Sequence, residues 1–307
     1  MPPTVPSTGP PTGRRLTGEN RRFPAEPAIP GVVHFFAPYP YRSPFYTEDP
    51  EEEAGRALEH LERVLLHEDP RRVAAIVLEP VVGSNGVIVY PEGYLRGVRE
   101  LCDRHGILLV FDEVMTGFGR VGEAFAAVRF GVVPDLITFA KGVTSGYVPL
   151  GGVLLREGLA RYFDETPLPT GHTYSGHPLA VAVGLAVLEA YREEGLFARV
   201  RAMEGFFRSA LEGLRPILGW GGAGPGGVLR GGAGEGPGEQ GAPLPLARSL
   251  EPAMGALVRA LFREGVYLLA KHNVLIVAPP LTIGKEEFLE GVERLSRALR
   301  RVEVEVA

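Results

Sequence analysis

Cysteine is nearly absent from this sequence, because Cys102 is the only one among 307 residues. A single thiol cannot form a disulfide within the chain, which excludes a disulfide-stapled domain and is typical of a reducing cytoplasm. Long apolar runs are also missing, since none approaches the roughly 20 residues that span a bilayer. The N-terminus lacks the apolar core of a signal peptide. We therefore expect a soluble cytoplasmic protein with no membrane partner.

A basic surface is missing as well. The net charge is −5 and the pI is about 5.9, whereas proteins that bind nucleic acids gather basic residues on one face. The arginine pairs at residues 14–15 and 21–22 fall in an irregular segment and are interpreted as solvated. His172 and His177 have no recurring acidic or cysteine partner nearby. We expect neither a nucleic-acid partner nor a metal site.

Apolar residues make up 45% of the chain and charged residues 22%, which predicts a large core in one large domain with a smaller one. Three short apolar runs are rich in branched residues, and their length predicts buried parallel strands. Each run is followed by a charged residue. The runs span residues 73–78, 107–111 and 136–140, and they are followed by Glu79, Asp112 and Lys141.

Segments with a helical pattern of apolar residues lie before, between and after these apolar runs. Apolar residues at helical spacing predict helices over residues 51–66, 92–105 and 177–191. Asp49-Pro50 is a start signal for the first helix, and Gly106 is a C-cap for the second. Cys102 lies on the apolar face of the second helix and is interpreted as a core residue. We also expect a strand at residues 32–36 and a short helix near residues 123–130.

This alternation predicts an α/β fold with a mostly parallel, doubly wound sheet. Ligands bind such sheets at the carboxyl ends of the strands. A lone charge at a strand end is usually only a solvated edge residue. Three at successive strands indicate a site with two carboxylates and an amine, so Glu79, Asp112 and Lys141 are candidate site residues.

Four stretches resemble a known family when they are taken in order and at their spacing. They read LEPVVGSNGVIVYPEGYL, FDEVMTGFGR, DLITFAKGVTSGYVPLGG and GHTYSGHPLA. They resemble the class III pyridoxal-phosphate-dependent aminotransferases of fold type I, over residues 18–214 and again from residue 246 to the end. The resemblance implies a large cofactor-binding domain with its connecting helix over residues 31–215, and a smaller C-terminal α+β domain over residues 246–307.

The resemblance also implies a pyridoxal 5′-phosphate cofactor and roles for the matching residues. Lys141 would bind the cofactor aldehyde covalently and then carry protons, which requires a partly deprotonated amine. Asp112 would pair with the pyridinium nitrogen and keep it protonated, so that the ring can accept electrons. Val114 would lie on the same strand face as Asp112 and pack on the ring.

Two further residues have implied roles beside ordinary structural ones. Glu79 matches a glutamate that pairs with a mobile arginine when one substrate is bound, and its alternative role is simple packing at the strand edge. Thr173 matches a threonine that reaches across a dimer interface to the cofactor phosphate, whereas a loop hydroxyl by itself would indicate only a local turn or cap. The implied assembly is a homodimer with its cofactor site at the interface.

The substrate preference follows from residues that differ from those of some relatives. Leu275-Ile276-Val277 stand where relatives that act on five-carbon amino acids carry an arginine for the substrate carboxylate. This favours an ω-amino acid, a taurine-like compound or a diamine as amino donor, and a 2-oxo acid such as pyruvate as acceptor. Met115 stands where many relatives carry a glutamine that hydrogen-bonds the cofactor.

Two segments do not fit an ordered domain. Residues 1–30 open with proline, threonine and glycine and are predicted to be irregular and disordered. Residues 216–245 form a second irregular segment, which has 12 glycines between positions 219 and 241. A flexible insert and a reading-frame shift are both interpretations of this segment.

The roughly one hundred N-terminal residues of the relatives, with their phosphate-binding loop, have no counterpart here, which indicates a truncated reading frame. Two functions therefore compete with an active transaminase. One is a non-catalytic fragment that keeps Lys141 but holds the cofactor poorly. The other is a nicotinamide-dependent oxidoreductase, which is disfavoured because no Gly-x-Gly-x-x-Gly pattern follows a strand.

Overall fold

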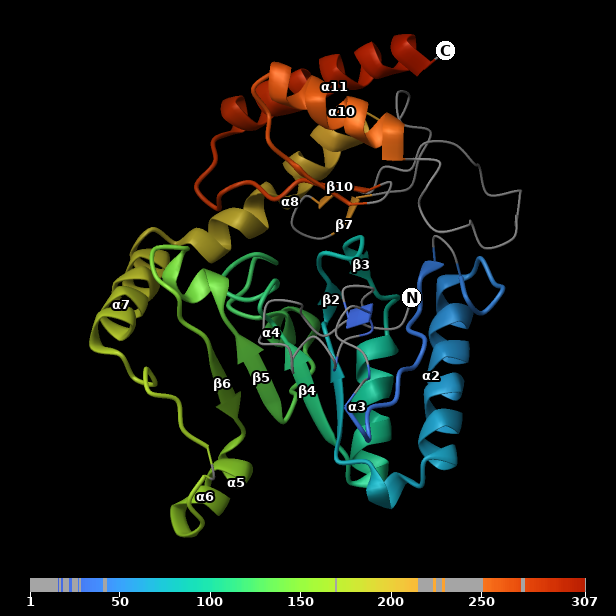
Figure 1. Cartoon of the computed structure of the whole chain (residues 1–307), viewed down its shortest axis with the longest axis vertical. Coiled ribbons are helices and arrows are strands. Elements are labelled where there is room, and N and C mark those ends of the chain that lie inside the picture. Colours follow the sequence, from blue (N-terminus) through green and yellow to red (C-terminus); the bar gives the residue numbers. More distant parts are fainter. Residues whose placement is uncertain are drawn as a thin grey trace. The chain divides into compact units, whose positions relative to one another are not determined.

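The computed structural model describes most residues of the chain. They are residues 16, 18, 22–23, 27, 29–40, 43–168, 170–214, 223–224, 228–229, 251–271 and 274–306. Their contacts divide them into two compact units, shown in Figure 1. The first comprises the described residues of Met1–Gly83 and Ile88–Phe197, and the second those of Ser84–Val87 and Ala198–Ala307. The predictions for residues 1–15 lie outside the described residues.

A four-stranded sheet organises the first unit, with the strand order β1-β4-β5-β6. The strands β1, β4 and β5 run parallel, and β6 pairs antiparallel with β5. Their bounds are Ala75–Leu78 for β1, Leu108–Asp112 for β4, Leu136–Phe139 for β5 and Gly152–Leu155 for β6. The prediction of an α/β fold with a mostly parallel sheet is confirmed, as Figure 1 shows.

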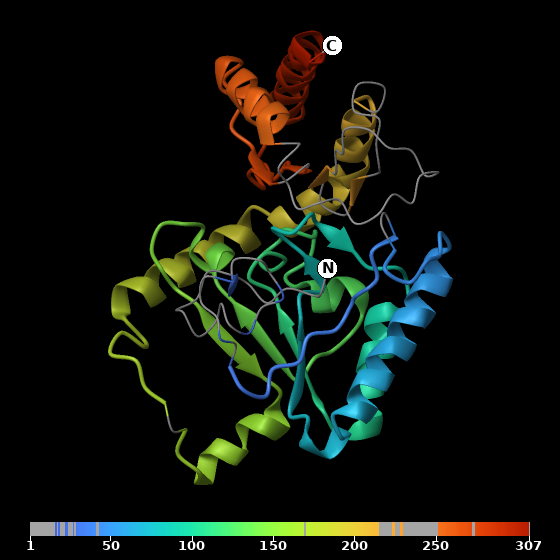
Figure 2. The ribbon, with the colours of Figure 1, turned by 45° about the vertical axis from the view of Figure 1, so that its right-hand side comes forward.

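Two amphipathic helices, α2 (Pro50–His67) and α3 (Tyr94–His105), lie side by side in both Figures 1 and 2. The helix α2 begins where predicted, because the Asp49 side chain accepts hydrogen bonds from the first free backbone N–H groups. The helix α3 ends where Gly106 turns into the left-handed conformation, at φ 67°. These caps are local signals, so they could be read from the sequence.

The core of the first unit is formed by apolar side chains of β1, β4, α2 and α3. Leu109, Phe111, Val98 and Cys102 have no exposed surface. The predicted core role of Cys102 is therefore confirmed. Because β4 lies between β1 and β5 and is buried, the residue at its carboxyl end is held by packing on both sides.

Shorter elements complete the first unit. A short 3₁₀ turn, η4, begins directly after β5 at Lys141. The elements are η3 (Pro70–Arg72), the antiparallel pair β2 (Val81–Val82) and β3 (Ile88–Val89), α4 (Ala126–Phe130), η4 (Lys141–Thr144), α5 (Glu157–Ala160), α6 (Tyr162–Glu165) and α7 (Pro178–Glu193).

The second unit has its own apolar core, in which Leu211, Leu261, Leu295 and Ala298 are almost fully buried. It contains helices and short antiparallel strand pairs. They are the greater part of α8 (Leu196–Glu212), then α10 (Glu251–Arg263), α11 (Lys285–Val306), β9 (Leu269–Lys271) with β10 (Val274–Ile276), and β7 (Ala223–Gly224) with β8 (Val228–Leu229).

The structure corrects the strand expected at residues 32–36, which take no regular conformation. The backbone N–H of Phe36 donates to Nε2 of His60 at 3.2 Å, and that of Tyr39 donates to Glu53 Oε1 at 2.5 Å. Because α2 side chains take these hydrogen bonds, the segment lies along a helix instead of joining a sheet. The sequence shows the apolar run but not its partner.

One segment and one boundary also differ from those expected. The glycine-rich segment was predicted to lack strands, yet it contains the two-residue pair β7 and β8. The contacts divide between Phe197 and Ala198, earlier than the expected end of the large domain at residue 215. The reason is packing, because Phe207, Leu211 and Leu214 join the core of the second unit. Among the described residues, no helix is long and apolar enough to cross a membrane.

Candidate functional site

The carboxyl ends of three parallel strands place polar residues at one level of the sheet. Leu78 pairs with Phe111, so Glu79 follows β1 beside the end of β4. Asp112 pairs with Thr138 on β5, and Lys141 begins the turn directly after β5 and Ala140. The edge predicted from sequence therefore brings Glu79, Asp112 and Lys141 to neighbouring strand ends.

Asp112 is a buried carboxyl group, with 5% of its surface exposed. Burial raises the pKa of Asp112 from 3.8 to about 6, although the Val114 N–H, the Thr138 hydroxyl and the positive charge of Lys141 all oppose this shift. The carboxyl group therefore has less positive charge around it than its burial requires. A cationic group placed against Asp112 would restore its ordinary ionisation.

Val114 lies beyond the strand whose alternation was used to place it. The strand β4 ends at Asp112, and the backbone N–H of Val114 donates to Asp112 Oδ1 at 3.0 Å. This side-chain hydrogen bond turns the chain, so the alternation of strand faces no longer applies after Asp112. Val114 is half-buried in the turn, next to the carboxyl group of Asp112.

Lys141 is exposed and takes a backbone conformation that is unusual for its residue type, with φ at 44°. Residues with a Cβ atom rarely adopt this left-handed region, so the backbone here is strained. The next residue, Gly142, lies against Phe118 in the glycine-rich loop of residues 116–120. A Cβ atom added to Gly142 would lie 2.7 Å from the Phe118 Cβ atom, so only glycine fits.

Glu79 is buried, with 4% exposure, and its Oε2 atom accepts a hydrogen bond from the Gly83 backbone N–H at 2.7 Å. Met115 lies in the same place, because a Cβ atom on Gly83 would be 2.7 Å from Met115 Cγ and 3.2 Å from Glu79 Oε2. The carboxylate of Glu79 thus ties the end of β1 to the residue that follows β2. Met115 packs beside it.

Glu113 is a site residue that sequence reasoning missed. It has no exposed surface, and its carboxylate accepts hydrogen bonds from Thr116 Oγ1 at 2.7 Å, Ala126 N at 2.6 Å and Ala127 N at 2.7 Å. It thereby ties the loop after Asp112 to the first turn of α4. Burial raises the pKa of Glu113, and these three donors oppose the shift. In the sequence, Glu113 shows only as an acidic residue next to Asp112. Acidic residues are too common at strand ends for that alone to assign it a role.

Thr173 lies in the exposed loop that precedes α7 and is itself exposed. It is not among the residues that the sheet edge brings together. Leu275, Ile276 and Val277 are buried, and Leu275 and Val277 belong to the core of the second unit. These three side chains therefore pack in an apolar core and offer no charged group to a carboxylate.

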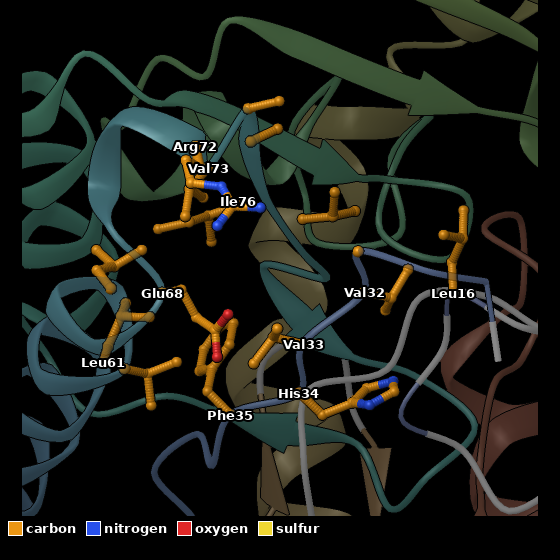
Figure 3. A pocket seen from close by; sticks show the side chains of 16 residues that line it. Leu16, Val32, Val33, His34, Phe35, Leu61, Glu68, Arg72, Val73 and Ile76 are labelled. Atoms are coloured by element: carbon orange, nitrogen blue, oxygen red, sulfur yellow. The ribbon is translucent and has the colours of Figure 1, made fainter.

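A cavity lies elsewhere in the first unit. Figure 3 shows this cavity of about 470 Å³, which is lined by residues 31–35, one face of α2 and the residues leading into and along β1. Its described lining residues include none of the five predicted site residues. This cavity is therefore separate from the polar residues at the carboxyl ends of the strands.

The residues at the sheet edge fit a covalently held cationic cofactor. Asp112 supplies a buried carboxyl group that lacks a sufficient cationic partner, and Lys141 supplies a primary amine from the adjacent strand end. Val114 contacts Asp112 through its backbone N–H and carries a half-buried apolar side chain. A protonated heteroaromatic ring joined to an amine needs this combination of groups.

Comparison with known proteins points to one family. A family model described as aminotransferase class-III matches residues 17–299. The chain is 38% identical over 270 residues to an omega-aminotransferase of Caulobacter vibrioides, which covers 82% of this chain and 56% of that protein. It is 45% identical over 179 residues to an omega-amino acid–pyruvate aminotransferase of Pseudomonas putida, which covers 55% of this chain and 40% of that protein.

Solved structures agree with the sequence comparison. The taurine:2-oxoglutarate aminotransferase of Bifidobacterium kashiwanohense, solved with PLP and glutamate, superposes with a TM-score of 0.90 at 38% identity. The superposition covers 99% of this chain and 69% of that chain. The chain thus spans a little over half the length of the C. vibrioides relative and about two thirds of this solved relative.

Proposed function

This chain belongs to the class III aminotransferases, and from that membership we propose that it performs pyridoxal-phosphate-dependent amino transfer. The proposed donor is an ω-amino acid, a taurine-like compound or a diamine, and the acceptor is a 2-oxo acid such as pyruvate. The observation that carries the proposal is the buried Asp112 carboxyl group beside Lys141 at the carboxyl edge of the sheet.

When bound, the cofactor supplies an electron sink that stabilises negative charge on the substrate carbon. Asp112 would hold a proton at the ring nitrogen, since a cation against this buried group favours the ionised carboxylate. Lys141 would hold the cofactor through its Nζ atom and, once released, move a proton to or from the substrate carbon. Val114 would pack against the ring and exclude water from it.

Glu79 is proposed to orient groups at this edge through its carboxylate. One oxygen accepts the N–H of Gly83, the residue after β2. In the proposed reaction the carboxylate also takes an arginine partner when one of the two substrates is bound. This role distinguishes the half-reactions, because a donor and an acceptor with different charges must use the same site.

The proposed assembly is a homodimer in the cytoplasm, where the buried thiol of Cys102 stays free. The helix α7 supports a second copy, because it presents exposed apolar side chains that would be unfavourable in water. They are Leu179 at 60% exposure, Leu185 at 58%, Leu188 at 42% and Val181 at 40%. Thr173 stands exposed just before this helix, so we propose that it contacts the cofactor phosphate of the partner copy.

The choice of donor class rests on the second unit. The buried segment Leu275-Ile276-Val277 contains no arginine that could bind the carboxylate of a five-carbon substrate. The names of the relatives, which include omega-aminotransferase and taurine:2-oxoglutarate aminotransferase, support donors whose amine is remote from the acidic group. The competing proposal is a chain that keeps Lys141 but does not turn over substrates.

The test is to add pyridoxal phosphate to the purified chain, record its visible absorbance, reduce it with borohydride and map the labelled peptide. Label on Lys141 is expected, followed by pyruvate-dependent amino transfer from at least one of β-alanine, taurine and putrescine. The matched control is Lys141→Arg, which keeps the charge but should lose both label and transfer. Label scattered over surface lysines would contradict the proposal, and label without transfer would favour the competing one.

A further inference from the structure

We propose that the Tyr191 hydroxyl positions Lys141, by holding the carbonyl of Gly142 and with it the strained turn in which Lys141 stands. The phenol OH of Tyr191 donates to the Gly142 carbonyl oxygen at 2.7 Å, across 49 residues of sequence. The inference rests on the proposed function of Lys141 as the residue that carries the cofactor. Tyr191 is a positioning residue in this scheme, because it acts through the backbone next to Lys141.

The turn after β5 needs such support. Lys141 has φ 44° and Ser145 has φ 49°, so two residues with a Cβ atom adopt the left-handed conformation within five positions. Such residues persist only where the surrounding structure determines them from several sides. Without those constraints the Lys141 backbone would relax to negative φ, and the direction of its side chain would change.

The Gly142 carbonyl oxygen accepts two hydrogen bonds that restrain the turn. Besides the Tyr191 hydroxyl, it accepts the backbone N–H of Ser145 at 3.2 Å, which closes the turn. Tyr191 is itself well fixed, with 8% exposure and its ring centroid 5.6 Å from that of Phe197. A buried, immobile donor loses little further entropy when it forms its hydrogen bond, so the carbonyl is held firmly.

Small residues allow α7 and the turn to approach closely. A Cβ atom on Gly184 of α7 would lie 3.2 Å from Leu150 Cδ2 and 3.7 Å from the Val143 carbonyl oxygen. On the other side, Gly142 lies against Phe118. The turn is therefore packed between α7 and the glycine-rich loop, and the Tyr191 hydroxyl supplies a polar contact from α7 directly to the residue after Lys141.

The experiment compares Tyr191→Phe with the parent chain by amide hydrogen exchange without cofactor or substrate. Phenylalanine keeps the ring packing but leaves the Gly142 carbonyl without this donor. Exchange of the amides in residues 141–148 is expected to rise about tenfold, as for the loss of one net hydrogen bond. The matched control is Tyr162→Phe, because Tyr162 is 64% exposed and lies on α6. This control should leave those amides unchanged.

The same substitution in a Lys141→Gly variant tests whether the Tyr191 hydroxyl acts through the backbone conformation of Lys141. In Lys141→Gly protein the left-handed backbone is no longer strained, so adding Tyr191→Phe should raise exchange less than about threefold. An equal rise in both backgrounds would overturn the inference, as would no rise in either. A fall in thermal stability alone, with local exchange unchanged, would leave Tyr191 as ordinary packing and would also overturn it.

Kinetics supply the readout on Lys141. In Tyr191→Phe, kcat should fall about tenfold while KM for the amino donor stays within about twofold, because the amine is misdirected and the substrate-binding groups are intact. If the parent chain transfers no amino group, the proposed function fails, but the exchange comparison still decides the inference. If the parent is active and Tyr191→Phe changes neither exchange nor kcat, only the inference fails.

Discussion

Asp112 and Asp135 are two buried aspartates at opposite ends of the same sheet, and their surroundings differ completely. Asp135, just before β5, is 8% exposed, and Asp112, at the end of β4, is 5% exposed. Asp135 accepts hydrogen bonds from Arg99 at 2.7 Å, Leu109 N at 2.8 Å and Arg156 at 3.0 Å. The two carboxyl groups are therefore about equally buried, but Asp135 has two guanidinium partners and a backbone donor, whereas Asp112 has too few partners to offset its burial.

The pKa values follow the partners and not the burial. Burial by itself raises the pKa of Asp135, but the Leu109 N–H and the guanidinium groups of Arg99 and Arg156 outweigh it and lower the pKa. For Asp112 burial prevails, and the pKa rises to about 6. The difference teaches that the amino end of the sheet uses its aspartate for stability, while the carboxyl end keeps one available for a ligand.

The largest effect should come from replacing the aspartate at the carboxyl end. Asp112→Asn should lower kcat/KM for amino transfer about 10³-fold, because an amide cannot keep the cofactor ring nitrogen protonated and loses a preorganised charge. Steady-state kinetics with excess cofactor measure this. The folded state, followed by circular dichroism, should be at least as stable as that of the parent. Activity within about threefold of the parent would remove Asp112 from the proposed site.

The same replacement at the amino end should affect folding instead. Asp135→Ala should lower the free energy of unfolding by about 3 kcal/mol, because it removes the buried acceptor shared by Arg99 and the Leu109 N–H and leaves Arg99 with the exposed Asp103 alone. Urea denaturation of the cofactor-free chain measures the loss. The matched control is Glu157→Gln, which removes an exposed carboxylate from α5 and should cost under about 0.5 kcal/mol. A similar loss in both variants would contradict the comparison.

The two aspartates should also give opposite dependences of stability on pH. The folded pKa of Asp112 lies above its unfolded value, so its contribution is fully present below about pH 3.8 and is lost as pH rises through about 6. An amide at this position does not ionise, so the stability gain of Asp112→Asn over the parent should grow by about 2 kcal/mol between pH 4 and pH 7. Asp135 has a lowered pKa, so its contribution is present above its ordinary pKa and is lost only as pH falls through the folded value.

Urea titrations at each pH, with cofactor absent, separate these contributions. A constant difference between Asp112→Asn and parent across this range would mean that the carboxyl group ionises normally. The comparison between the two ends of the sheet would then lose its electrostatic basis.

The smallest effect concerns the carboxylate next to Asp112. Glu113→Gln keeps the size of the side chain but supplies one acceptor oxygen to the Thr116, Ala126 and Ala127 donors, so the free energy of unfolding should fall by about 1–2 kcal/mol. Amino transfer should fall only about threefold, because the loop that carries Val114 loosens. Denaturation and kinetics on one preparation measure both. A loss of activity as large as that of Asp112→Asn would assign Glu113 a direct role.

Much of the fold was readable because its signals are local. The apolar runs before Glu79, Asp112 and Lys141 are strands, and the cap residues Asp49 and Gly106 mark helix ends. Secondary structure was predicted wrongly where a partner distant in sequence determined the conformation. Residues 32–36 have strand composition, but α2 side chains accept the backbone N–H groups of Phe36 and of Tyr39 just beyond.

The candidate site divides in the same way. Its residue types and their placement at strand ends could be predicted, because parallel strands bring their carboxyl ends to one edge. The turn at Val114 could not, since it depends on the Asp112 side chain accepting a backbone hydrogen bond. Glu113 was missed because its three donors come from a loop and a helix that close around it only in the folded chain.

The sequence by itself determined the strand and helix pattern, the family and the identity of the residues at the sheet edge, because periodicity, caps and motifs act over a few neighbouring positions. Only the tertiary structure decided that the pKa of Asp112 is raised and that of Asp135 lowered. Desolvation and ion pairing depend on what is packed around each carboxyl group. The tertiary structure also decided that Tyr191 contacts the carbonyl next to Lys141. A hydrogen bond between such distant residues exists only once the helix has packed on the turn.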